Sequence, residues 1–190
     1  MGRKIQTIKS MMERNHVSLG GNLYSKHYLY LAKNLKENKI CTLLEFENCS
    51  FNIEDLKAIM ESLAWNNLIR VLIFKSIFLS SEHLFLISQF VCQSDRIDRL
   101  ELISCDLNSK CFSSLCDSFS TNKSIKILNL SSNKISSDGM PLLCDALKKN
   151  SCITHLDLSS NNIGSAGQKK KKLFYINIKS NKKNKKQKNF

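Results

Sequence analysis

Apolar residues recur along the chain in a pattern that repeats about every 28 residues. The clearest copies are IKILNLSSNKI at 125–135 and ITHLDLSSNNI at 153–163, with apolar residues at the first, fourth, sixth and eleventh positions and asparagine at the ninth. Frames of this form start at positions 14, 41, 69, 97, 125 and 153, so one spacing is 27 residues and the others are 28. Such repetition is typical of a solenoid, in which each unit packs against its neighbours.

Each unit predicts a short strand followed by a helix. The apolar fourth and sixth positions point to one side, as a strand with one buried face requires. In the second half of the unit, apolar residues such as Leu56, Ile59 and Leu63 fall on one helical face because they are three and four residues apart. Asparagine is a frequent residue at helix ends. Helices are therefore expected to end near Asn38, Asn66, Asn122 and Asn150.

Stacking these units predicts an α/β solenoid. Neighbouring strands lie about 4.8 Å apart, whereas packed helices need about 8–10 Å. A parallel sheet should therefore curve on the concave side, with the helices on the convex side. We expect an N-terminal cap segment at 1–13, about five full repeats plus a partial sixth at 14–167, and a basic, low-complexity, disordered tail at 168–190.

The ninth position of each frame is assigned a structural role at the turn after the strand. The chain bends there, and an inward side chain can satisfy backbone groups that lose their partners in the sheet. The residues assigned to this role are Asn22, Cys49, Cys105, Asn133 and Asn161. The third frame departs from the pattern, because Ile77 stands at this position.

The pattern resembles the leucine-rich repeats of the ribonuclease-inhibitor-like subfamily. The similarity lies in the 28-residue unit, the true helices and the sequence motif LxLSxNxI…GxxxL, and it covers about residues 14–167. The resemblance implies a protein-binding solenoid. Its members include ribonuclease inhibitors, ligand sensors of immune receptors, GTPase activators and ciliary or nuclear scaffolds.

The net charge of +13 is concentrated at one end of the chain. Residues 169–190 carry ten lysines and no acid, and the remaining 19 Lys and Arg against 16 Asp and Glu leave only +3 for the body. This distribution indicates a tail rather than a basic binding face. Binding of nucleic acid through Lys169–Lys188 is therefore the alternative and not the favoured prediction. The loss of the apolar helix pattern at Gln168 and Lys171 favours a truncated product of a longer repeat protein.

No targeting or membrane signal is visible in the sequence. Residues 1–15 lack an apolar core segment, and no stretch of 18 uncharged apolar residues occurs. We therefore expect no membrane association and a cytoplasmic location, with the nucleus as the alternative.

The chemistry-bearing residues do not form a catalytic or metal-binding pattern. The eight cysteines include no CxxC, and several occupy repeat positions that are apolar in other units. They are therefore predicted to be reduced structural thiols rather than disulfides or zinc ligands. Neither the histidines nor the serines show the spacing of a positioned base and nucleophile. We expect a non-enzymatic protein without cofactor or metal.

The candidate binding surface is the concave face of the sheet. Side chains at the third, fifth, seventh and eighth positions of each frame should point there, with an apolar centre and an acidic margin suited to a protein with a basic rim. The residues assigned to partner binding are Glu45, Glu47, Val71, Ile73, Arg99, Glu101 and Ile103. The alternative is that these residues only cover the surface of the sheet and bind no partner. Other functions left open are an RNA-associated or nuclear protein using the basic tail and a regulator of a small GTPase or ribonuclease.

Overall fold

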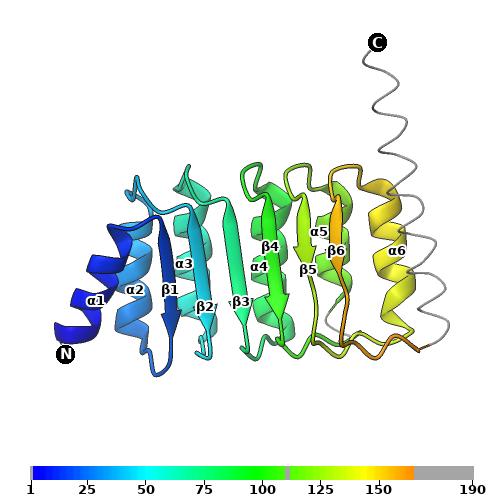
Figure 1. Ribbon diagram of the computed structural model, residues 1–190, viewed down its shortest axis with the longest axis horizontal. Coiled ribbons are helices and arrows are strands. Elements are labelled where there is room, and N and C mark those ends of the chain that lie inside the picture. The colour runs from blue at the N-terminus through cyan, green and yellow to red at the C-terminus, as the bar shows by residue number, and fades with distance from the viewer. Residues whose placement is uncertain (1, 110–111, 165–190) are drawn as a thin grey trace, which may run out of the picture.

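The computed structural model describes residues 2–109 and 112–164, and within them six helices alternate with six strands (Figure 1). The helices are α1 (Gly2–Met12), α2 (Ser25–Leu35), α3 (Ile53–Trp65), α4 (Ser81–Gln93), α5 (Ser113–Thr121) and α6 (Gly139–Lys149). The strands are β1 (His16–Gly20), β2 (Leu43–Glu47), β3 (Val71–Lys75), β4 (Arg99–Ile103), β5 (Ile127–Asn129) and β6 (His155–Asp157).

All six strands form one parallel sheet in the order of the chain, β1-β2-β3-β4-β5-β6. The helices form a second layer along one side of this sheet (Figure 1). The register pairs Leu44 with Leu72, Leu72 with Leu100 and Leu100 with Leu128, so equivalent positions of successive units lie side by side. The predicted α/β solenoid is confirmed. The tail expected at 168–190 lies outside the described residues.

The core lies between the sheet and the helices. The fourth and sixth positions of each frame are buried, as in Leu100 and Leu102, and so are the inward helix positions, such as Leu56 and Ile59. Burial of each such side chain contributes about 1.5–3 kcal/mol. Helix starts are fixed locally: the Asn52 side chain accepts a hydrogen bond from the backbone N–H of Asp55 at the N-terminus of α3.

The first unit is closed by α1. This helix contacts β1 and α2, and it buries Ile8 and Met12 against them. Asn38 ties the end of α2 to this helix, because its side-chain amide donates a 2.7 Å hydrogen bond to the carbonyl of Met12. The segment predicted as the cap therefore covers the apolar side of the first strand–helix unit.

The sequence prediction was wrong about the eighth position of each frame, whose side chain was expected on the concave face of the strand. The residue there has a left-handed backbone with φ between 50° and 71°, and it lies in the turn after the strand. These residues are Gly21, Asn48, Ser76, Ser104, Ser132 and Ser160. The strand ends here because the chain must turn toward the helix layer, and only glycine and small polar residues adopt this conformation at low cost.

Candidate binding surface

The sheet face, which we define as the third, fifth and seventh positions of each frame, lies opposite the helices. The register places Glu45, Ile73 and Glu101 in one row across β2, β3 and β4. A second row passes through Val71 and Arg99, and a third through Glu47, Lys75 and Ile103. The structure therefore brings the seven predicted binding residues together on three neighbouring strands.

The three glutamates of the predicted site each lie beside a basic side chain. Lys75 Nζ lies 2.7 Å from Glu47 Oε1, and His16 Nε2 lies 3.2 Å from Glu45 Oε2. Arg99 Nη2 lies 2.5 Å from Glu101 Oε1. The hydrogen bond that Lys75 donates to the Glu47 carboxylate raises the pKa of Lys75. The three glutamates of the predicted site therefore each lie beside a basic residue instead of forming a free acidic margin.

Exposure divides the predicted binding residues into two groups. Arg99 is exposed and Val71 is half-buried. Glu101 is only 5% exposed and Ile73 only 9%. The longer Arg99 side chain covers Glu101. The Glu101 carboxylate accepts hydrogen bonds from the Arg99 guanidinium and so holds it in this position. Ile73 and Glu101 can therefore offer little area to a partner.

The half-buried apolar residues of the sheet face extend beyond the predicted set. Val71 lies between Leu43 on β2 and Arg99 on β4, and Ile127 continues the same row on β5. Leu43, Ile103 and Ile127 are half-buried as well. Leu43 and Ile127 were not assigned to the site, although their third position in the frame is the signal that places them there.

The Arg99–Glu101 pair leads to a stability prediction. We expect Arg99→Met to lower the free energy of unfolding by about 2–3 kcal/mol, because it leaves the buried Glu101 carboxylate without its cation. The matched control is Lys75→Met, whose partner Glu47 is 35% exposed, and it should lower the free energy of unfolding much less than Arg99→Met does. Urea denaturation measures both. Equal losses would contradict the burial of Glu101.

Asn133 and Asn161 connect the turns of successive units through hydrogen bonds. Asn133 Nδ2 donates to the carbonyls of Leu102, Leu130 and Ser131, at 2.7, 3.0 and 3.0 Å. Its Oδ1 accepts from two backbone N–H groups in the preceding unit. Asn161 makes the equivalent bond to the carbonyl of Leu130 at 2.8 Å. We call this row of ninth-position side chains the turn ladder.

The other residues assigned to the turn behave differently. Cys105 is buried and donates its thiol to the carbonyl of Phe74 at 3.3 Å, which is the position equivalent to Leu102. Cys49 is half-buried, and Asn22 is exposed. The first unit packs against α1 rather than against a preceding repeat, so Asn22 has no earlier turn to bind.

A second ladder, which the sequence analysis did not foresee, joins the helix ends. Asn66 donates its amide to the carbonyls of Leu35 and Asn38, at 2.7 and 3.2 Å, and its Oδ1 accepts from the N–H groups of Leu68 and Ile69. The same arrangement recurs at Asn122 and Asn150. We call this row the helix-end ladder. The signal was the recurrence of asparagine every 28 residues, which was interpreted only as helix termination.

The cysteines contribute to packing. The seven in the described residues are free, and these residues contain no cluster of three or more His, Cys, Asp or Glu side chains able to hold a metal ion. Burial raises the pKa of Cys105 to about 12. It also raises the pKa of Cys116 to about 12, with a smaller contribution from the neighbouring Asp117 charge. Both thiols therefore stay protonated at neutral pH.

This burial predicts a difference in thiol reactivity. Raising the pKa from 9.0 to about 12 reduces the thiolate fraction at pH 8 about 1000-fold, since three units separate the two values. We expect a thiol reagent to label the exposed Cys92 first, and Cys105 and Cys116 only in denaturant. Peptide mass spectrometry measures the rates. Equal labelling of the three in the native protein would contradict the assignment.

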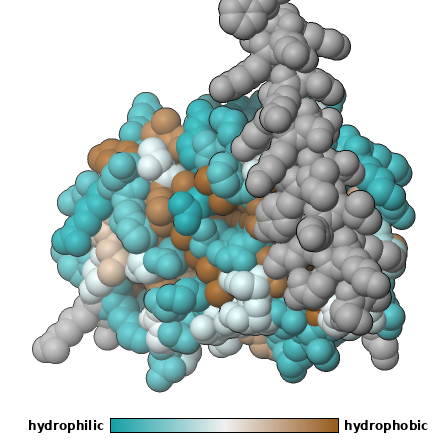
Figure 2. All heavy atoms as spheres, turned by 45° about the vertical axis from the view of Figure 1, so that its right-hand side comes forward, coloured by the Kyte–Doolittle hydropathy of each residue, from teal (hydrophilic) through white to brown (hydrophobic). Residues whose placement is uncertain are grey.

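The remaining surface is mixed in character. Figure 2, which turns the β6–α6 end of the sheet forward, shows mainly hydrophilic residues with apolar ones between them. Phe78, Phe85 and Trp65 are large and exposed, and Lys36 Nζ lies 4.9 Å from the centroid of the Trp65 ring. None of the helices in the part of the chain that the structure describes has the length and apolar character needed to cross a membrane.

Comparison with known proteins finds a family match for two segments of the chain. Residues 121–144 and 149–170 match the family model described as Leucine Rich repeat. No curated protein matches the chain. These matched segments include the two frames, at 125–135 and 153–163, in which the repeat motif is clearest.

Among solved structures the chain is similar to leiomodin-1 actin-binding site 2, at 11% identity and a TM-score of 0.48, over 97% of this chain and 92% of that one. It is also similar to the tropomodulin C-terminal domain of Caenorhabditis elegans, at 9% identity and a TM-score of 0.38, over 96% and 95%. A protein of Bacteroides fragilis aligns at 13% identity and a TM-score of 0.43, over 90% and 66%.

Proposed function

We infer that this chain, which is a leucine-rich repeat protein, is a non-enzymatic module that binds another protein through its sheet face. The observation that carries the proposal is the continuity of that face over β2, β3 and β4. The proposed contact residues are Glu45, Glu47, Val71, Arg99 and Ile103, and Leu43 and Ile127 extend their apolar row. Ile73 and Glu101 belong to the same site but lie buried beneath these contacts.

The charges of this face favour a protein over a nucleic acid. Phosphate binding requires cations that are free to replace counterions. Lys75 and Arg99 are each already paired with a glutamate, at 2.7 and 2.5 Å. Half-buried Val71 and Ile103 instead offer apolar contact beside polar groups, which is the usual composition of a protein interface.

The test compares a sheet-face variant with a matched helix-face control. Glu47→Lys, Val71→Ser and Ile103→Ser together change the binding surface at half-buried positions, which spares the fold. Lys57→Glu and Glu61→Lys change charges of the same kind on the exposed side of α3. Proteins captured by the full chain are identified and purified, and their dissociation constants are measured with each variant by calorimetry.

We expect the sheet-face substitutions to weaken the affinity for the partner at least 100-fold, which corresponds to about 2.7 kcal/mol of binding free energy. The helix-face control should bind the partner as tightly as the parent chain does. Unchanged affinity in the sheet-face variant, with an unchanged melting temperature, would overturn the proposed site. A captured nucleic acid whose affinity falls steeply with salt would overturn the proposed class of partner and favour the basic tail.

A further inference from the structure

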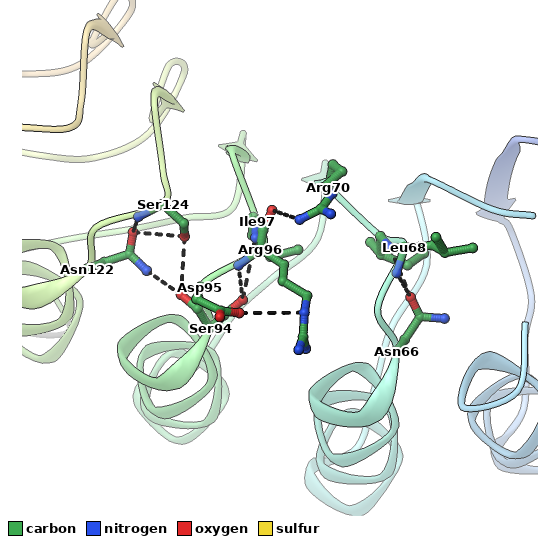
Figure 3. A network of polar contacts seen from close by, with 10 residues as sticks. Asn66, Leu68, Arg70, Ser94, Asp95, Arg96, Ile97, Asn122 and Ser124 are labelled. Carbon is green, nitrogen blue, oxygen red and sulfur yellow. Dashed lines mark hydrogen bonds and ion pairs between the residues drawn. The ribbon is translucent and has the colours of Figure 1, made fainter. Parts of the chain in front are cut away.

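The helix-end ladder is interrupted between α3 and α4. Ser94 is the C-cap that follows helix α4, whereas the ladder has asparagine at the equivalent position after α2, α3, α5 and α6. The Ser94 hydroxyl is too short to reach the preceding unit. Its Oγ lies 3.4 Å from the N–H of Arg96 and 3.5 Å from that of Ile97, against 2.9 Å for each of the two N–H groups bound by Asn66 (Figure 3).

The repeat geometry identifies which backbone groups lose a partner. Asn122 Nδ2 donates to the carbonyl of Val91, three residues before the C-cap Ser94, and to the carbonyl of Ser94 itself. One unit earlier the equivalent acceptors are the carbonyls of Leu63 and Asn66. Within the described residues, Leu63 accepts only the backbone N–H of Asn66 at the helix end, and the Asn66 carbonyl accepts no hydrogen bond.

A cavity of about 200 Å³ lies at this interruption. We call it the ladder recess, and it is lined by residues at the ends of α3 and α4, among them Leu63, Asn66, Phe90, Ser94, Arg96 and Ile97. Pockets for drug-sized ligands measure about 300–1000 Å³. The ladder recess is therefore of a size to receive one side chain rather than a cofactor.

The polar groups of the ladder recess match an uncharged ligand. The carbonyls of Leu63 and Asn66 can each accept a further hydrogen bond, and the Ser94 hydroxyl can donate one. Asp95 and Arg96 are ion-paired at its rim, with 3.6 Å between Asp95 Oδ1 and Arg96 Nε, so neither sign of charge is favoured. In the neighbouring units a carboxamide satisfies the equivalent groups.

We propose that the ladder recess binds the primary carboxamide of a glutamine or asparagine side chain on a partner protein. The amide nitrogen donates to the carbonyls of Leu63 and Asn66, and the amide oxygen accepts from the Ser94 hydroxyl. The aliphatic stem packs against Leu63 and Phe90, which line the same recess. This site lies at the helix ends and not on the sheet face, so its test is independent of the function proposed above.

The probe is N-acetylglutamine N-methylamide, titrated into the ¹⁵N-labelled full chain and followed by the backbone amide signals of residues 63–66 and 94–97. A single side chain offers few atoms, so we expect saturation at millimolar concentration. The control is the corresponding blocked glutamate, which has the same stem and a carboxylate, and should bind at least tenfold more weakly. Equal binding of the two, or shifts that do not saturate, would overturn the proposal.

Two variants test the same site from the protein side. Ser94→Asn supplies the missing carboxamide from within the chain, so it should abolish probe binding while raising the melting temperature. Ser94→Ala removes only the hydroxyl donor and should lower the affinity for the probe several-fold. The raised melting temperature of Ser94→Asn shows that loss of binding does not come from unfolding. Probe binding that is unchanged in Ser94→Asn would show that the recess is not the site.

Discussion

Leu102→Asp is expected to unfold the protein at room temperature. Leu102 is completely buried at the sixth position of its frame, on the side of β4 that faces the helix layer. A carboxylate there would lie among apolar side chains with no cation or donor to pair with. Burial of an uncompensated polar or charged group costs several kcal/mol, and the whole stability of a small domain is only about 5–15 kcal/mol. Circular dichroism and urea denaturation measure the loss.

The matched control is Ser132→Asp. Ser132 is exposed, and its φ of 57° is one that aspartate tolerates better than most residues. We expect a change in the free energy of unfolding within about 0.5 kcal/mol. Leu128→Asp, in the next unit at a fully buried fourth position, should unfold the protein as Leu102→Asp does. Similar melting shifts for Leu102→Asp and Ser132→Asp would contradict the inward and outward assignment.

The fold was predictable because the first five units carry the same two periodicities. Strand positions such as Leu100 and Leu102 alternate in one half of the unit, and helix positions such as Leu115 and Phe119 recur at steps of three and four in the other. Because a one-residue shift in a strand would move every buried side chain to the other face, the pattern also determined the register. The left-handed turn residues were missed, since serine there has no strong local signal for a positive φ.

The candidate surface was predictable in position but not in character. Frame positions alone placed Val71, Arg99 and Glu101 on one face, and the register brings them together. Whether Glu101 is free or buried depends on the direction of the long Arg99 side chain across it, which periodicity does not encode. The helix-end ladder was missed for a similar reason, since its bonds join residues about 30 positions apart, such as Asn66 and Leu35.

The turn ladder leads to the second large effect, at Asn133. We expect Asn133→Ala to lower the free energy of unfolding by about 3–5 kcal/mol. The side chain is 7% exposed, and it makes five hydrogen bonds of 2.7–3.1 Å to backbone groups. Each buried group left without a partner costs about 1–3 kcal/mol, although water entering the space recovers part of this.

Asn161→Ala is the matched control, because it removes the same side chain from the equivalent position of the next unit. Asn161 is only half-buried in the structure, so water can replace its bonds, and the loss should be about 1–2 kcal/mol. A further variant, Asn133→Cys, copies the thiol that stands at Cys105 one unit earlier and donates to the carbonyl of Phe74. That thiol can satisfy a carbonyl but is a weak acceptor for the two N–H groups, so the loss should lie between those of Asn161→Ala and Asn133→Ala. If Asn133→Ala cost no more than Asn161→Ala, the stability of this turn would come from backbone pairing and apolar burial rather than from the buried amide.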